Sequence, residues 1–399
     1  MKKYLSRSTS LIAHPYQPPA GFDAVQPAVH RASTVIFKNV AAMRARTWKE
    51  KVGYTYGLHG TPTTFTLEER IATLEGGLQT LLVPSGLASI TLVDMALLAA
   101  GDQVLIPTNA YGPGREFARH ELAAWGIGHA FYDPMTPATL AAAITPATRL
   151  VWIEAPGSVT MEFPDITALV AVARERGVTT ALDNTWGAGL AFQPFALVQG
   201  DGSLAAVDIS VQALTKYPSG GADVLMGSVT TRDEALHQRL KATHMRSGFG
   251  VAGNDCELVL RSLPSLPLRY EAQARAGLTL AQWWRERPEV AKVLHPALPG
   301  SPGHEHWARL CSDAAGLFSV VFDARYPMQR VDAFVDALRL FRIGYSWAGP
   351  TSLVVPYDWT LLRGAPSSEG TLVRFALGLE DVGDLIGDCL QALAALDRD

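Results

Sequence analysis

The sequence predicts an α/β fold with a mostly parallel central sheet covered by helices, followed by a smaller α+β domain. Three observations support this prediction. The chain has 399 residues, of which 48% are hydrophobic, so it is long enough for two domains and apolar enough for a sizeable core. Apolar strand-like runs alternate with helical segments from about residue 80 to residue 230, a pattern typical of parallel sheets. This alternation stops at the prolines between residues 264 and 267.

The first 60 residues are rich in proline and show little periodicity. A segment of this length is too long for a loop inside a compact domain, so we expect an extended arm that lies across a neighbouring subunit. A short helix is expected at residues 40–48.

Residues 61–260 are expected to form the large domain. Its first helix is predicted to begin at Thr66, with Glu69 completing a capping box, and to end at Gly76 and Gly77. The strands expected after it are 80–83, 103–106, 129–132, 150–153, 179–182, 209–211 and 224–230. The helices expected between them are 85–98, 112–125, 137–144 and 166–176.

Residues 261–399 are expected to form the small domain. It should contain helices at 268–286, 328–341 and 380–397, and strands at 316–322 and 371–377. The segment 288–302, rich in proline and glycine, is expected to be a loop.

Composition excludes several classes of protein. A net charge of −4 with no long basic stretch argues against a nucleic-acid partner. Three widely spaced cysteines fit neither a disulfide framework nor a zinc site, and His295, His304 and His306 lack further metal ligands nearby, so no metal is expected. We see no signal peptide and no apolar run long enough for a membrane span, and we expect a cytoplasmic protein.

Four candidate ligand-binding residues follow predicted strands, at the sheet edge where ligands of parallel sheets bind. They are the turn at Gly86, an aromatic ring at Tyr111, a carboxylate at Asp183 and an amine at Lys216. Taken singly, each also fits a structural role, such as a common strand–helix turn, a tyrosine packed on the sheet edge, an aspartate that caps a helix or a solvated lysine. Together they supply backbone amides that can bind an anion, an aromatic ring that can stack on a flat ligand, a carboxylate that can pair with a ring nitrogen and an amine that can form a Schiff base. That combination matches pyridoxal 5′-phosphate.

Five motifs carry a resemblance to a known family. They are Tyr56-Gly57 with Gly60-Thr61-Pro62-Thr63, Leu74-Glu75-Gly76-Gly77, Asn109-Ala110-Tyr111, Asp183-Asn184-Thr185-Trp186 and Ala213-Leu214-Thr215-Lys216-Tyr217. With these motifs the chain resembles, from about residue 50 to residue 382, the Cys/Met-metabolism family of pyridoxal-phosphate enzymes. The resemblance implies the aspartate-aminotransferase-type fold, known as fold type I. Three further stretches, at 154–162, 295–301 and 345–349, resemble the members that eliminate at the β-carbon.

The resemblance also implies roles for single residues. Lys216 would form the Schiff base and move the α-proton, Asp183 would face the pyridine nitrogen, and Tyr111 would stack on the ring. The cofactor-binding residues implied are Tyr56, Gly86, Leu87, Tyr111, Asp183, Thr185, Thr215 and Lys216. Lys216, Tyr111 and Tyr56 are implied as catalytic, with Tyr56 reaching the phosphate of the neighbouring subunit's cofactor. Arg374 would hold the substrate α-carboxylate, in a site lined by Ser346 and Trp347.

The activity implied is a β-elimination that cleaves L-cystathionine to L-homocysteine, pyruvate and ammonia, a step toward methionine. Alternatives left open are a broader cysteine-S-conjugate lyase, a γ-acting lyase or synthase, and a non-catalytic regulator that binds the cofactor. The resemblance further implies a homotetramer, built as a dimer of dimers.

Three departures from the family pattern stand out. Leu58, followed by His59, occupies the position where an arginine usually contacts the phosphate. Ala213 stands where many relatives have serine. An apparent insertion at about 199–205 lengthens the spacing between Asp183 and Lys216, and we expect a surface loop there.

Overall fold

The computed structural model describes residues 6–12, 20–21, 24–48, 50–51, 53–359, 362 and 370–397. A seven-stranded sheet forms its centre, in the order β1-β9-β8-β5-β4-β2-β3. Its strands are β1 Gln79–Val83, β2 Gln103–Pro107, β3 Gly128–Tyr132, β4 Thr148–Glu154, β5 Thr179–Asp183, β8 Ile209–Gln212 and β9 Gly227–Thr231. Only β9 runs against its neighbours. The predicted fold class is therefore confirmed.

Neighbouring residues of each central strand point into different helical layers. Leu81 and Val104 belong to one buried cluster, whereas Leu82 and Leu105, the next residues along, belong to another. Successive side chains of a strand face opposite sides, so the sheet is covered on both faces. The covering helices are α3 Pro62–Glu75, α4 Gly86–Leu97, α5 Gly112–Phe117, α6 Pro137–Ala143, α7 Ile166–Glu175 and α8 Glu234–Ser247.

The predicted start of the first helix is wrong. Helix α3 begins at Pro62, and Thr61 is its N-cap, with reciprocal hydrogen bonds between Thr61 and Thr64. Thr66 lies one turn inside the helix, where its hydroxyl donates to the carbonyl of Pro62. Proline is favoured at the first helical position, so Pro62 is the better signal for the start. The predicted end is confirmed, because Gly76 has a left-handed φ of 73°.

A second, five-stranded sheet has the order β10-β11-β14-β13-β12. Its strands are β10 Val290–Leu294, β11 Leu317–Phe322, β12 Arg342–Ile343, β13 Leu353–Tyr357 and β14 Leu372–Ala376. The prediction missed three of these strands, namely β10, which was placed in a loop, the short β12, and β13, which contains Pro356. Helices α10 Leu266–Arg285, α12 Met328–Ala337 and α14 Val382–Leu393 surround an aromatic core that includes Trp284, Phe318 and Phe375.

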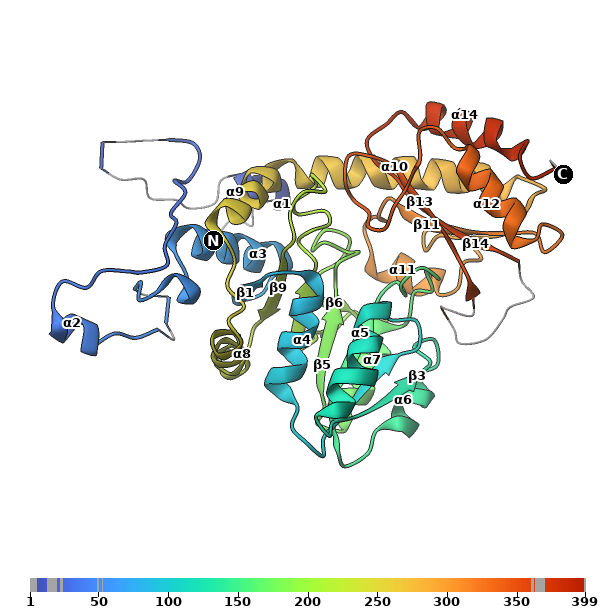
Figure 1. Cartoon of the computed structure of the whole chain (residues 1–399). Coiled ribbons are helices and arrows are strands. Elements are labelled where there is room, and N and C mark those ends of the chain that lie inside the picture. Colours follow the sequence, from blue (N-terminus) through green and yellow to red (C-terminus); the bar gives the residue numbers. More distant parts are fainter. Residues whose placement is uncertain are drawn as a thin grey trace.

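Helix α10 extends from α9 Gly253–Ser262, beside the large sheet, to the small sheet below α14 (Figure 1). Loops at the end of the large sheet contact loops of the small sheet, as the hydrogen bond from Lys216 to Ser346 shows. The domain limits at residues 60 and 260 stay predictions.

Part of the expected N-terminal arm packs on the chain itself. In α1 Arg7–Ile12, Leu11 is buried in the core that also contains Leu67 of α3. Residues 24–48 are mostly exposed. His30 and Arg31 still bond to Thr63 and Asn254 of the chain, whereas α2 Val40–Arg44 projects away from the rest (Figure 1). Their expected role at a neighbouring subunit stays a prediction.

The insertion near residue 200 forms a short exposed hairpin between β6 Leu197–Val198 and β7 Leu204–Ala205. Helices in the described ranges include none that is long and apolar enough to cross a membrane.

Candidate active site

The predicted lysine and aspartate meet at the carboxyl edge of the large sheet. Asp183 is the last residue of β5, where it pairs with Val211 of the neighbouring strand β8. Lys216 follows β8 in a tight turn, in which its amide donates to the carbonyl of Ala213. The two side chains are close enough for each charge to affect the pKa of the other.

Lys216 lies among groups from both sheets. Its Nζ donates to the hydroxyl of Ser346 at 2.7 Å and lies 5.6 Å from the centre of the Trp347 ring. Burial and the charge of Arg374 lower the pKa of Lys216 to about 8, and Asp183 partly offsets this decrease. The neutral fraction of the amine near neutral pH is therefore far larger than for an ordinary lysine, as a nucleophile or base requires.

Asp183 presents a carboxylate without a cationic partner. Its Oδ1 accepts a hydrogen bond from the amide of Thr185 at 2.9 Å. Within the residues that the structure describes, Asp183 forms no ion pair. Burial raises the pKa of Asp183, against hydrogen bonds from Thr185 and the charge of Lys216. Such a group can share a proton with a ligand nitrogen.

Tyr111 is held at this edge by a residue to which the sequence motifs assign no role. Tyr111 immediately precedes α5, and its amide donates to Glu154 Oε2 at 2.7 Å. Glu154 ends β4 directly opposite Asp183 of β5. Burial and the nearby charge of Asp183 raise the pKa of Glu154 well above its ordinary value. Its position at a strand end, like that of Asp183, is the signal that could have identified it.

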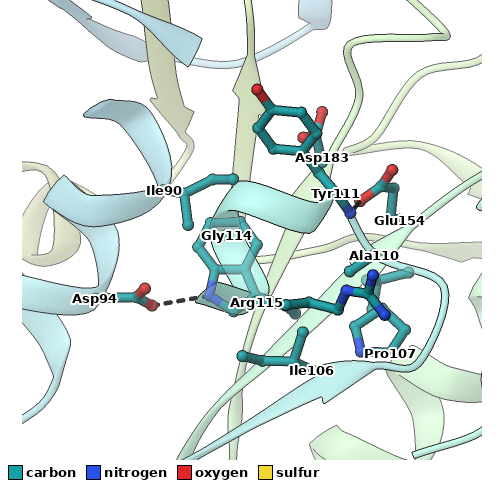
Figure 2. A pocket seen from close by; sticks show the side chains of 12 residues that line it. Ile90, Asp94, Ile106, Pro107, Ala110, Tyr111, Gly114, Arg115, Glu154 and Asp183 are labelled. Carbon is teal, nitrogen blue, oxygen red and sulfur yellow. Dashed lines mark hydrogen bonds between the residues drawn. The ribbon is translucent and has the colours of Figure 1, made fainter. Parts of the chain in front are cut away.

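A small, partly open pocket lies beside these groups. Figure 2 shows Tyr111, Glu154 and Asp183 gathered on one side of it and Asp94 on the other. Asp94 is 1% exposed and accepts a hydrogen bond from Trp152 Nε1 at 2.8 Å. Burial raises the pKa of Asp94 to about 7. The pocket therefore combines apolar walls with carboxyl groups whose pKa values are raised by burial.

The amides predicted to bind an anion lie at the start of α4. Gly86 and Leu87 open this helix, so their amides have no acceptor within it. A Cβ at Gly86 would lie 2.5 Å from Cβ of Ala213, so only glycine permits this approach of α4 to the lysine turn. The Thr185 hydroxyl accepts from the amide of Ala213 at 2.9 Å. This close packing brings the helix start, which favours anions, beside Lys216.

The Thr215 hydroxyl already has protein partners. It donates to the carbonyl of Met226 at 3.1 Å and accepts from the amide of the same residue at 3.0 Å. To donate to a phosphate it would have to give up the bond to the carbonyl.

Arg374 projects from β14 toward the lysine and is 7% exposed. Its Nη2 donates to the carbonyl of Ser346 at 3.2 Å, whereas Nε has no partner in the part of the chain that the structure describes. No described carboxylate lies within ion-pair distance of the guanidinium. A buried guanidinium without an anion is costly, so this arrangement suits a carboxylate ligand.

Tyr56 does not join this group within one chain. It is 44% exposed, and it contacts Ser33 and His59. Leu58 and His59 line a different cavity, and His59 Nδ1 lies 2.6 Å from the hydroxyl of Thr55. The role of Tyr56 at a partner's cofactor stays a prediction.

Comparisons with known proteins identify the family of the chain. A family model described as "Cys/Met metabolism PLP-dependent enzyme" matches residues 8–394. A putative cystathionine beta-lyase from Rhizobium johnstonii is 42% identical, with 93% of this chain and 91% of that protein covered. The cystathionine beta-lyase of Bordetella avium is 38% identical, with coverages of 95% and 94%. An L-alanine/L-glutamate racemase from Wolbachia pipientis is 34% identical, with coverages of 94% and 93%.

Among solved structures, the crystal structure of metB from Corynebacterium glutamicum has a TM-score of 0.87 and 26% identity. The match covers 98% of both chains. Because the match covers nearly the whole chain, the two structures share both sheets and the way in which these sheets are arranged.

Proposed function

We propose that this chain, which belongs to the Cys/Met-metabolism family of pyridoxal-phosphate-dependent enzymes, cleaves L-cystathionine by β-elimination. The products would be L-homocysteine, pyruvate and ammonia. One observation carries the proposal: a partly neutral amine, Lys216, lies near an anion-free guanidinium, Arg374. In an α-amino acid, the carboxylate would bind Arg374 and the carbon that bears the amine would lie near Lys216.

The residues present fit the cofactor of the family. The glycine required at position 86 leaves the first amides of α4 free for a phosphate, and Asp183 has a carboxylate without a cation for a ring nitrogen. Tyr111, half-exposed above that carboxylate, would cover the ring. Pyridoxal phosphate, when bound, supplies an aldehyde for the lysine and an electron sink for charge released at the α-carbon.

The protein groups then have separate tasks. Arg374 would orient the substrate through its α-carboxylate. Lys216 would take the α-proton as a base, and its lowered pKa suits that task. Ser346 would hold the amine in place through its hydroxyl. Loss of the β-thiol then completes the elimination, and hydrolysis of the remaining three-carbon fragment by water gives pyruvate and ammonia.

Product analysis tests the proposal. Purified enzyme given L-cystathionine should release pyruvate and homocysteine in equal amounts, and Lys216→Ala should lower the rate by at least about 100-fold. Lys292→Ala, which removes an exposed lysine of β10, is the matched control and should behave as the unmodified enzyme. Lys216→Ala with an unchanged rate would refute the assignment of the base.

Product analysis with L-cystathionine and with further substrates separates the alternatives. Release of 2-oxobutyrate would identify γ-elimination, and synthesis of cystathionine would identify a synthase. Conversion of L-alanine to D-alanine would favour the reaction named for the Wolbachia relative. Pyruvate from many cysteine S-conjugates would indicate a broader lyase, and no product from any of these substrates would favour a regulator.

We also propose a cytoplasmic homotetramer. The exposed Tyr56 and the projecting segment before it support an assembly in which these residues complete a partner's site. Sedimentation velocity of the purified protein would test the number of subunits.

A further inference from the structure

The guanidinium of Arg374 rests on an aromatic ring. Its central carbon lies 5.4 Å from the centre of the Tyr357 ring. Tyr357 ends β13, and Val355, two residues earlier, pairs directly with Arg374 on β14. Residues two apart on a strand share a face, so Tyr357 stands diagonally across from Arg374 on the same side of the small sheet. The register of the sheet therefore produces this contact.

Few hydrogen bonds from the described residues restrain the guanidinium. Among the described residues, one hydrogen bond is present, from Nη2 to the carbonyl of Ser346, and Nε has no partner. The group has five N–H donors, and the described residues place no carboxylate within ion-pair distance of it. A guanidinium held at one corner can rotate unless a surface supports its flat face. The Tyr357 ring is that surface.

We propose that Tyr357 is a positioning residue for Arg374, whose ring keeps the N–H edge of the guanidinium turned toward the α-carboxylate of an amino acid. The inference rests on the proposed function, in which Arg374 binds that carboxylate. A ring attracts a cation over its face and leaves the edge free for bidentate hydrogen bonds. It also keeps water from that face, which strengthens the charge pair formed at the edge.

The ring, rather than the hydroxyl, is assigned this role. The phenol groups of Tyr111, Tyr345 and Tyr357 all act on the pKa of Arg374, so loss of one hydroxyl leaves two others nearby. Loss of the Tyr357 ring removes the surface beneath the guanidinium. Tyr357→Phe and Tyr357→Leu separate these two contributions.

The test uses two ligands that differ only by a carboxylate. Glycine and methylamine are titrated into the cofactor-loaded enzyme, and binding is followed by calorimetry and by the absorbance of the bound cofactor. Tyr357→Leu should weaken glycine binding about 5- to 20-fold, the range expected for a desolvated cation–π contact. Methylamine binding should change by less than about two-fold, because methylamine makes no use of Arg374. Tyr357→Phe should keep the preference for glycine.

A matched control is available elsewhere in the chain. Tyr326 supports the exposed side chain of Arg325 at 4.9 Å in the same manner. Tyr326→Leu removes a ring that supports a different arginine and should leave both ligands unaffected. If Tyr357→Leu does not fold, as judged by circular dichroism, Tyr357→Met provides the same loss of the ring with an unbranched side chain.

Three results would overturn the inference. Unchanged glycine binding in Tyr357→Leu would show that the ring is not needed. Equal weakening by Tyr357→Phe would assign the effect to the hydroxyl, and equal weakening of methylamine would indicate general damage. An enzyme that prefers glycine to methylamine but makes no pyruvate from L-cystathionine would refute the proposed substrate alone.

Discussion

The Nζ of Lys216 lies 2.7 Å from the hydroxyl oxygen of Ser346, and the carbonyl of the same serine accepts a hydrogen bond from Arg374. One residue thus contacts both groups on which the proposed chemistry depends. Ser346 adopts a φ of 101°, a left-handed conformation that is unfavourable for a residue with a side chain. The strain is retained in a residue that links the two sheets at the predicted site.

Two substitutions of Ser346 should separate the effect of its hydroxyl on activity from the effect of its positive φ on stability. Ser346→Ala and Ser346→Gly both remove the acceptor for Lys216, so pyruvate formation should fall by about 10-fold in each, equivalent to one ordinary hydrogen bond. Glycine tolerates the positive φ, so Ser346→Gly should exceed Ser346→Ala in free energy of unfolding by about 0.5–1 kcal/mol. Steady-state kinetics and denaturant unfolding measure the two effects. Full activity in both variants would contradict the role of the hydroxyl.

Asp183→Asn should leave the cofactor bound but inactive. The amide has a similar shape but cannot carry the negative charge that would keep a ring nitrogen protonated. Pyruvate formation should fall by about 100-fold or more, the effect of losing a proton-positioning group. The visible absorbance of the bound cofactor should remain, because Lys216 is intact. Asp183→Glu, which keeps the charge, should retain more activity than Asp183→Asn; the opposite order would exclude this role.

Cofactor uptake by the cofactor-free protein should depend on pH through Lys216. Only the neutral amine attacks an aldehyde, and burial lowers the pKa of this amine to about 8. The rate of covalent uptake, followed by absorbance, should therefore rise with pH and reach half its maximum near pH 8. Arg374→Met removes a positive charge that contributes to the lowered pKa, so its midpoint should move to higher pH. If the unmodified protein showed a midpoint near the pKa of an ordinary lysine, burial and Arg374 would not lower the pKa of Lys216 as described.

Asp94→Asn should stabilise the protein increasingly as pH rises. The ordinary pKa of 3.8 holds in the unfolded chain, whereas burial raises the folded value to about 7. Between these values the unfolded state loses a proton that the folded state keeps, so the unmodified protein loses stability with rising pH; above about pH 7 both states are ionised and the penalty is constant. Asparagine removes the penalty, and its oxygen can still accept from Trp152.

The advantage of Asp94→Asn in free energy of unfolding should therefore grow from near zero at about pH 4 to about 4 kcal/mol at about pH 8. Urea denaturation at several pH values measures it. A difference that does not change with pH would show that Asp94 titrates normally in the folded protein.

The large sheet could be predicted because its strands carry their own signal. Leu150 to Ile153 are all buried, as expected for a strand covered on both faces, and such a run stands out in the sequence. Parallel strands end at the same edge, so the sequence alone was enough to place Asp183 and Lys216 together. The same rule, applied to the end of β4, would have added Glu154, which lies opposite Asp183.

Other elements gave weak or conflicting local signals. Strand β13 was missed because it contains Pro356, which is unusual within a strand. Strand β10 is largely exposed on its middle residues and lacks a clear apolar pattern. The start of α3 was misplaced because a threonine inside the helix resembled a cap, although Thr61 and Pro62 held the stronger signal.

By itself the sequence determined the fold class, the family pattern and the amine and carboxylate at the edge of the large sheet. Those features depend on burial and turn chemistry within a few neighbouring residues. The resemblance already implied that Arg374 and Ser346 lie in the substrate site. Only the tertiary structure showed which contacts they make, namely that Ser346 bonds to both Lys216 and Arg374, and that Tyr357 lies beneath the guanidinium. These contacts depend on how two separate sheets pack and on the register of β13 against β14, and no local stretch of sequence specifies either.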